Sequence, residues 1–235
     1  MKEGISMNTK KGIWARLGIG VGLLAGFAAW TVLVGWGDVK AIGPQGSSVG
    51  FATLNGWFHG LTGVHMSLYT VTDWLGLVPI AVALGFAVLG LVQWIRRKHL
   101  VRVDSSLFVL GGFYAVVMIV YVLFEMFVIN YRPVLIEGRL EASYPSSTTM
   151  LVMCVMPTAM MQLCDRIKRK TVRRCVCLVI AAFTVFMVIG RLISGVHWVT
   201  DIIGGATVSA GLVTIYDAIC RLCPDTYTNK GSTNH

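Results

Sequence analysis

The chain has 235 residues, of which 55% are hydrophobic and 13% are charged, and its formal net charge is +9. A disordered chain is excluded, because disorder needs low hydrophobicity and high charge. Soluble domains carry about a quarter charged residues, so this composition also disfavours a soluble globule. A basic excess on so apolar a chain indicates a membrane protein with positive cytoplasmic loops rather than a nucleic-acid-binding protein.

Six apolar runs follow one another along the chain, and each is close to the roughly 20 residues that cross the hydrocarbon core as a helix. They cover residues 17–36, 74–95, 107–129, 148–163, 175–190 and 198–219. The first run follows a basic start, but its length and the lack of a small-residue cleavage site indicate a retained helix rather than a signal peptide. The sequence therefore predicts an all-α integral membrane bundle of six transmembrane helices.

Basic residues are distributed unevenly between the two sides of this bundle. With the N-terminus inside, sixteen of the twenty lie in cytoplasmic segments, and the outer side keeps Lys40, Arg132, Arg139 and Arg191. Because positive loops stay in the cytoplasm, this alternation predicts that both termini are cytoplasmic. The chain lacks a targeting segment, so we expect it in a bacterial plasma membrane.

The runs divide the chain into a cytoplasmic N-terminus (1–16), a six-helix domain (17–219) and a cytoplasmic tail (220–235). The tail is polar, and we expect it to be disordered. The first outer loop, 37–73, is the longest. Its moderately apolar part, 51–69, is compatible with a position along the membrane surface.

The six cysteines do not indicate a disulfide framework, because all of them lie in predicted helices or near the cytoplasmic side. Cys220 and Cys223 have the spacing of half a zinc site, but no second pair or histidine accompanies them. We therefore expect reduced cysteines packed at a helix end, no metal site and no cofactor.

Polar residues at membrane depth are costly and mark functional sites by default. On the outer side they gather in two groups, the first formed by residues 130–133 and 144–149 and the second by residues 190–201. The topology derived from loop charge puts both groups on one face of the bundle. Two arginines, a histidine and an aspartate are therefore expected to converge there.

The spacing in these groups has a chemical meaning. His197 and Asp201 are four residues apart, so on a helix the carboxylate can hold one ring nitrogen and leave the other free as a base or nucleophile. Arg132 and Arg191 carry planar guanidinium groups that suit phosphate oxygens. Residues 145–149 sit where a helix begins, and free N–H groups there form an anion site. Each feature alone also fits a structural role, such as an N-cap, and their conjunction carries the prediction.

These residues resemble the signature of the type-2 phosphatidate phosphatases, or lipid phosphate phosphatases, of the vanadium haloperoxidase-like superfamily. The motifs of that family read KxxxxxxRP, PSGH and SRxxxxxHxxxD. The resemblance by motif covers residues 125–201, and the six-helix topology extends it over most of the chain. The matching positions are Arg132, Pro133, Pro145, Ser146, Arg191, His197 and Asp201.

The resemblance implies metal-independent hydrolysis of a lipid phosphate or diphosphate on the extracytoplasmic face. His197 would attack phosphorus and form a phosphohistidine, and Asp201 would orient its imidazole. The expected phosphate-binding residues are Arg132, Ser146, Ser147, Thr148 and Arg191. The expected partners are the bilayer and the lipid substrate, with no nucleic acid and no protein partner.

Three positions depart from the motifs. Gly190 replaces a serine and removes one hydroxyl from the expected phosphate site. Glu125 falls where the family has a lysine, and Thr148 falls where the second motif has histidine. In the family that histidine resembles a general acid, and a threonine hydroxyl cannot supply a proton near pH 7 as an imidazole can.

These departures leave several interpretations open. The first is a degenerate member that binds lipid phosphates without turnover. The second is an enzyme with another proton donor, such as Glu125, Glu137 or Glu141. A third reading is a diphosphate substrate, such as an undecaprenyl diphosphate, whose phosphate leaving group has a pKa of about 6. A small membrane transporter is a further alternative, although no inverted repeat supports it.

Overall fold

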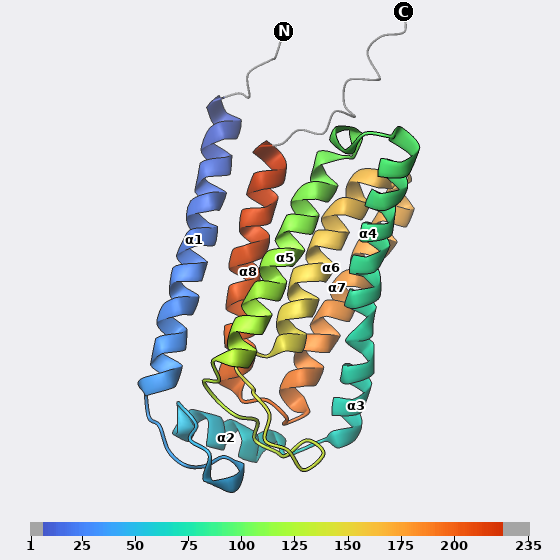
Figure 1. Ribbon diagram of the computed structural model, residues 1–235. Helices are drawn as coiled ribbons and strands as arrows, with labels where there is room; N and C mark the ends of the chain where they lie inside the picture. Colours follow the sequence, from blue (N-terminus) through green and yellow to red (C-terminus); the bar gives the residue numbers. More distant parts are fainter. Residues whose placement is uncertain (1–6, 223–235) are drawn as a thin grey trace, which may run out of the picture.

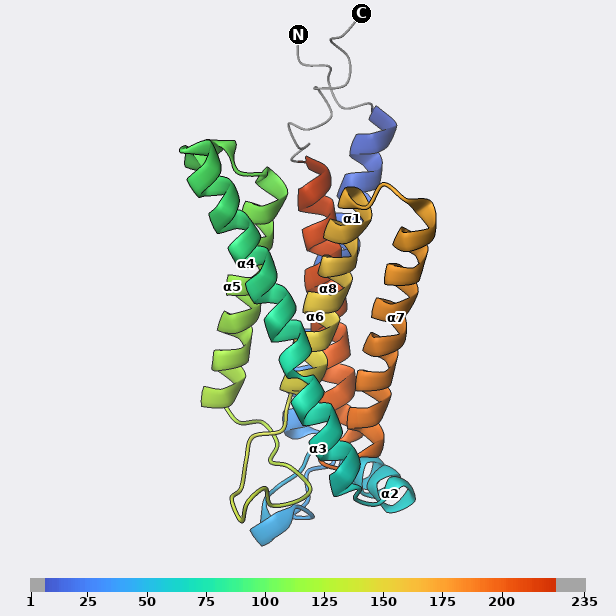
Figure 2. The same ribbon diagram turned by 90° about the vertical axis from the view of Figure 1, so that its right-hand side faces the viewer.

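The computed structural model describes residues 7–222, and Figures 1 and 2 show them as an elongated bundle of helices. The elements are α1 (Met7–Trp36), η1 (Pro44–Gly46), α2 (Ala52–Thr62), α3 (Met66–Leu75), α4 (Leu77–Arg97), η2 (Leu100–Arg102), α5 (Ser105–Met126), α6 (Ser147–Arg166), α7 (Lys170–Ile193) and α8 (Val199–Leu222). Within this described part, six helical segments are long and apolar enough to cross a membrane, with α3 and α4 forming one of them. The prediction of an all-α integral membrane bundle of six spans is confirmed. The predicted disordered tail lies outside the described residues from residue 223 onward.

Several helices extend beyond the apolar runs of the sequence. α1 begins at Met7 rather than at residue 17, and its early turns carry Lys10 and Lys11. α7 likewise begins at Lys170, ahead of the predicted start at residue 175. Long basic side chains keep their charge in water while their aliphatic stems lie along the helix. Hydropathy therefore marks the part of each helix inside the hydrocarbon, and the helices continue past it.

α6 and α8 form the centre of the bundle. Half of the apolar window of each is buried, against 17% for α1. α8 packs against α1, α5, α6 and α7, and its Tyr216 ring lies 5.1 Å from that of Phe113 on α5. Polar residues at the ends of these two central helices are consequently buried as well.

The polypeptide outside the six spans gathers at one end of the bundle. Figure 1 shows α2 lying across this end, while α3 runs into α4. The connection between α5 and α6 lies there too, folded back on itself by the antiparallel bridges Tyr131–Ala142 and Ile136–Arg139. α6 and α8 begin at this end and α7 terminates there, so the two predicted polar groups meet.

Candidate active site

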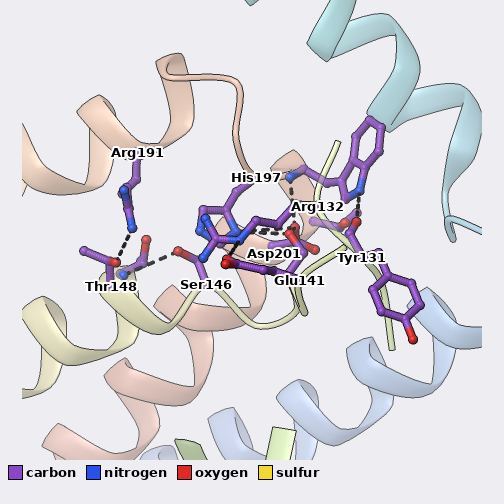
Figure 3. Close-up of polar contacts among 12 residues, drawn as sticks. Tyr131, Arg132, Glu141, Ser146, Thr148, Arg191, His197 and Asp201 are labelled. Carbon is purple, nitrogen blue, oxygen red and sulfur yellow. Dashed lines mark hydrogen bonds and ion pairs between the residues drawn. The ribbon is translucent and has the colours of Figure 1, made fainter. Parts of the chain in front are cut away.

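The predicted site residues come from four segments at this end of the bundle. Arg132 lies in the α5–α6 connection, while Ser146, Ser147 and Thr148 open α6. Arg191 is in the last turn of α7, His197 lies in the short link to α8, and Asp201 is in the first turn of α8. Figure 3 labels all of these residues except Ser147 and shows their side chains gathered together.

His197 is buried, and the surrounding charges keep its imidazole neutral. Its residue surface is 3% exposed. Burial lowers the pKa of His197 well below its usual value, and the positive charges of Arg132 and then Arg191 lower it further. Its Nε2 atom makes no hydrogen bond within the described residues. A neutral imidazole with a free ring nitrogen is the state that a nucleophile or base requires.

Asp201 lies beside His197, but the two side chains do not bond directly. His197 Nδ1 and Asp201 Oδ2 are 3.8 Å apart, which exceeds the length of a hydrogen bond. The hydroxyl of Ser143 lies between them, 3.1 Å from Nδ1 and 2.5 Å from Oδ2. Oδ2 also accepts the backbone N–H of Trp198 at 2.9 Å. The i, i+4 spacing therefore places the pair correctly, and a third residue bridges it.

Arg191 is held from three sides. Its Nη2 donates to Thr148 Oγ1 at 2.7 Å and to Asp73 Oδ1 at 3.0 Å. Its guanidinium carbon lies 4.9 Å from the ring centroid of Tyr69. The side chain of Arg191 is 2% exposed, whereas that of Asp73 is 55% exposed. A buried cation thus faces a carboxylate that stands at the solvent edge of the site.

Arg132 is less completely paired. Its Nε lies 3.2 Å from Glu141 Oε2, although the contact lacks the direction of a hydrogen bond. Nε and Nη1 are both buried without a hydrogen-bond partner in the described part of the chain. Buried donors are normally satisfied, so these two N–H groups provide places for an anion.

The start of α6 supplies further donors. The backbone N–H of Ser146 donates to Asp201 O at 3.1 Å, which ties α6 to α8. The hydroxyl of Ser146 accepts from the N–H of Thr149, at a long 3.5 Å. The N–H groups of Ser147 and Thr148 have no acceptor among residues 7–222. Helix N-termini with free N–H groups bind anions. Here Arg132 and Arg191 flank the N-terminus of α6.

The long segment between α1 and α3 fixes the link that carries His197. Gly195 has φ +69°, and a Cβ on it would lie 1.9 Å from Gly63 O. The N–H of His65 donates to Ser194 O at 2.9 Å, and His59 Nε2 lies 3.2 Å from Gly195 O. This segment therefore braces the backbone that positions the imidazole, a role that its sequence did not indicate.

Comparison with known proteins identifies a family. The profile of the PAP2 superfamily matches residues 80–225 of the chain. The chain belongs to the PAP2 superfamily. Membership supports hydrolysis of a phosphoric ester in general. None of the curated proteins with which the chain was compared matches it.

A solved structure has a similar fold. It is described as the first transmembrane PAP2-type phosphatidylglycerolphosphate phosphatase from Bacillus subtilis. The two chains are 18% identical, the match covers 85% of this chain and 94% of the other, and the TM-score is 0.57. At this identity the likeness shows a shared fold and leaves the substrate open.

The structure gives a steric reason for one departure from the PAP2 motifs. A Cβ on Gly190 would lie 2.8 Å from Thr72 Cγ2 on α3. Thr72 Oγ1 in turn lies 3.4 Å from Arg191 Nη1. Glycine at this position lets α3 approach α7, and the hydroxyl of Thr72 on α3 then contacts Arg191.

Glu125, the predicted alternative proton donor, borders the cluster without bonding to its charged side chains in the described part of the chain. It is exposed in the last turn of α5 and lines a small pocket with Ser143 and Ser147. Within the described residues, no hydrogen bond or ion pair joins Glu125 to Arg132 or His197. Glu141, another candidate, pairs with Arg132.

Four residues of the site were not predicted from the sequence. Tyr69, Thr72 and Asp73 surround Arg191 from α3, and Ser143 joins His197 to Asp201. α3 falls in a loop that carries no phosphatase motif. The one sequence signal for its approach was Gly190, which marks the place where it packs.

Proposed function

We propose that the protein is a lipid phosphate or diphosphate phosphatase that works through a phosphohistidine on His197, without a metal ion. The observation that carries the proposal is the buried, neutral imidazole of His197, whose unpartnered Nε2 lies in a cluster with two arginines. The loop-charge pattern supports a site on the extracytoplasmic face of the plasma membrane.

In the first step, the lone pair of Nε2 forms a bond to phosphorus as the bond from phosphorus to the leaving oxygen breaks. The electron pair of that bond stays on the leaving oxygen. Arg132, Arg191 and the free N–H groups at the start of α6 stabilise the negative charge on the phosphoryl oxygens. Water then attacks phosphorus, the N–P bond breaks, and inorganic phosphate leaves.

The leaving group sets the substrate preference. Thr148 stands where other family members have a histidine, and its hydroxyl oxygen accepts a hydrogen bond from Arg191 at 2.7 Å. A lipid alkoxide needs a proton from such a position, whereas a lipid phosphate leaves as a stable anion with a second pKa of about 6. We therefore favour an isoprenoid or other lipid diphosphate, such as undecaprenyl diphosphate, over a monoester.

A matched pair of substrates tests this preference. Purified protein is assayed on the diphosphate and the monophosphate of one isoprenoid alcohol, and the diphosphate is expected to react faster. Thr148→His is expected to raise monoester hydrolysis selectively, because an imidazole near neutral pKa restores the acid. Equal rates on both substrates, or a faster monoester, contradict the preference.

The second candidate is a protein that binds lipid phosphates without turnover. Thr148 favours it, because the general acid of the family is missing. The same end of the bundle would then serve as an anion site formed by Arg132 and Arg191. Binding of a lipid phosphate to purified protein with no release of inorganic phosphate, on any of the substrates above, would support this candidate.

A further inference from the structure

The hydroxyl of Ser143 occupies a position that the phosphatase motifs do not explain. Ser143 is 2% exposed, and its Oγ is the atom that contacts both His197 Nδ1 and Asp201 Oδ2. The direct distance between those two atoms, 3.8 Å, is too long for a hydrogen bond. The hydroxyl therefore provides the hydrogen-bonded link between Asp201 and the imidazole.

The donors and acceptors in this chain of contacts can be assigned. A serine hydroxyl has one proton to donate and lone pairs to accept with. An ionised carboxylate oxygen can only accept, so the hydroxyl gives its proton to Oδ2, which also accepts the N–H of Trp198. Its lone pair is then left to accept Nδ1–H of His197. The imidazole consequently carries its proton on Nδ1 and keeps a lone pair on Nε2.

The backbone holds Ser143 in place independently of His197. Its N–H donates to Asn130 O at 2.9 Å, and Asn130 Oδ1 accepts from the N–H of Gly50 at 3.1 Å. The α5–α6 connection and the first outer loop therefore fix the hydroxyl before substrate binds. A pre-positioned acceptor of this kind sets the orientation of the ring to which it bonds.

We propose that Ser143 is a positioning residue. It fixes His197 in the tautomer with its proton on Nδ1, and its hydroxyl links the imidazole to the carboxylate of Asp201 by two hydrogen bonds. The inference rests on the proposed function only for its kinetic consequence. As positive charge develops on the ring during attack, the Ser143 oxygen, polarised by Asp201, stabilises Nδ1–H. No proton leaves Nδ1 in this step.

The experiment uses the full-length protein in lipid nanodiscs, with its five histidines labelled with ¹⁵N. The signal of His197 is assigned by its loss in His197→Gln. Ser143→Ala removes the hydroxyl, and Ser143→Thr keeps it. Ser209→Ala is the matched control, because Ser209 is equally buried on α8 and its hydroxyl bonds to backbone carbonyls.

We expect wild-type His197 to be protonated on Nδ1, and Ser143→Ala to give a mixture of tautomers. On a lipid diphosphate, Ser143→Ala is expected to lower kcat by about 10²-fold to 10⁴-fold with little change in KM, the range found for misplaced or wrongly protonated catalytic histidines. Ser143→Thr should recover much of the loss, and Ser209→Ala should behave as wild type.

Three results would overturn the proposal. The first is a wild-type His197 protonated on Nε2, which needs no variant to observe. The second is a Ser143→Ala protein with wild-type tautomer and kcat, since the ring would then close on Asp201 directly. The third is a loss of kcat in Ser143→Thr as large as that in Ser143→Ala, with the tautomer of His197 unchanged in both variants. That result would show that Ser143 acts through packing alone. If no lipid phosphate is hydrolysed but the tautomer shifts in Ser143→Ala, the proposed function fails and the positioning role stands.

Discussion

Restoring the serine of the PAP2 motif at position 190 is expected to destabilise this protein. The resemblance to the family implies that a serine here adds a hydroxyl to the phosphate site, so Gly190→Ser looks like a gain. Here a Cβ at that position would lie 2.8 Å from Thr72 Cγ2, well inside the 3.5–4.0 Å at which carbon atoms normally pack. Either Thr72 must rotate or α3 must move away from α7.

Both adjustments carry a cost that the structure allows to be estimated. Rotation of Thr72 breaks the shared hydrogen bond that its single hydroxyl proton makes to Leu68 O at 2.9 Å and Tyr69 O at 3.0 Å, worth about 1 kcal/mol in all. Overpacking of this kind costs about 1–3 kcal/mol. At about 2–4 °C per kcal/mol for a chain of this size, the melting temperature should fall by about 2–12 °C.

Thermal unfolding in detergent measures this effect, and a second substitution isolates its cause. Thr72→Ser removes Cγ2 but keeps the hydroxyl, so it should restore the melting temperature when combined with Gly190→Ser. A single Gly190→Ser protein as stable as wild type would refute the steric account. A double variant no more stable than the single one would refute it equally.

Two further predictions concern charge. Asp73→Asn should tighten inhibition by inorganic phosphate about tenfold, because Asp73 then no longer competes with phosphate for Arg191. The bond lost is charge-assisted and worth about 1.5–3 kcal/mol, reduced because Asp73 is exposed. Asp38→Asn, in the same loop, is the control, and unchanged or weaker inhibition by phosphate in Asp73→Asn contradicts the prediction. The lowered pKa of His197 means that kcat/KM should hold as pH falls through 6.5 and drop only at lower pH, when the imidazole of the free protein gains a proton. Because the unfolded state takes up that proton at a higher pH than the folded state, the free energy of unfolding should decrease as pH falls below about 6.5. A fall in kcat/KM that already sets in at or above about pH 6.5 would contradict the lowered pKa of His197.

The membrane architecture was predictable because it depends on local composition. Six runs of apolar residues gave the six spans, and only their ends were wrong, since α1 starts at Met7 and α7 at Lys170. Hydropathy cannot place a helix end that lies in water. The α2 and α3 helices were not predicted for a related reason, because the moderate hydropathy of residues 51–69 does not distinguish a segment on the membrane surface from helices packed on the end of the bundle.

The site likewise has a part that local sequence predicts and a part that it does not. His197 and Asp201 are close in sequence, so helical spacing alone brought them together. Ser143 and His197 are 54 residues apart, and Asp73 and Arg191 are 118 apart. Contacts over such separations depend on how helices pack, and a single sequence does not reveal the packing. The motifs therefore indicated the phosphate-binding and nucleophilic groups, whereas the residues that orient them required the structure.

The central claim is that His197 carries the phosphoryl group, and trapping the phosphoenzyme tests it most directly. Protein in nanodiscs is mixed with a lipid diphosphate labelled with ³²P in its terminal phosphate, quenched in alkali, and analysed for acid-labile, alkali-stable label on the chain. Label is expected in the wild type, less label in Ser143→Ala and none in His197→Ala. Label that persists in His197→Ala, or turnover of substrate by that variant at the wild-type rate, would contradict it.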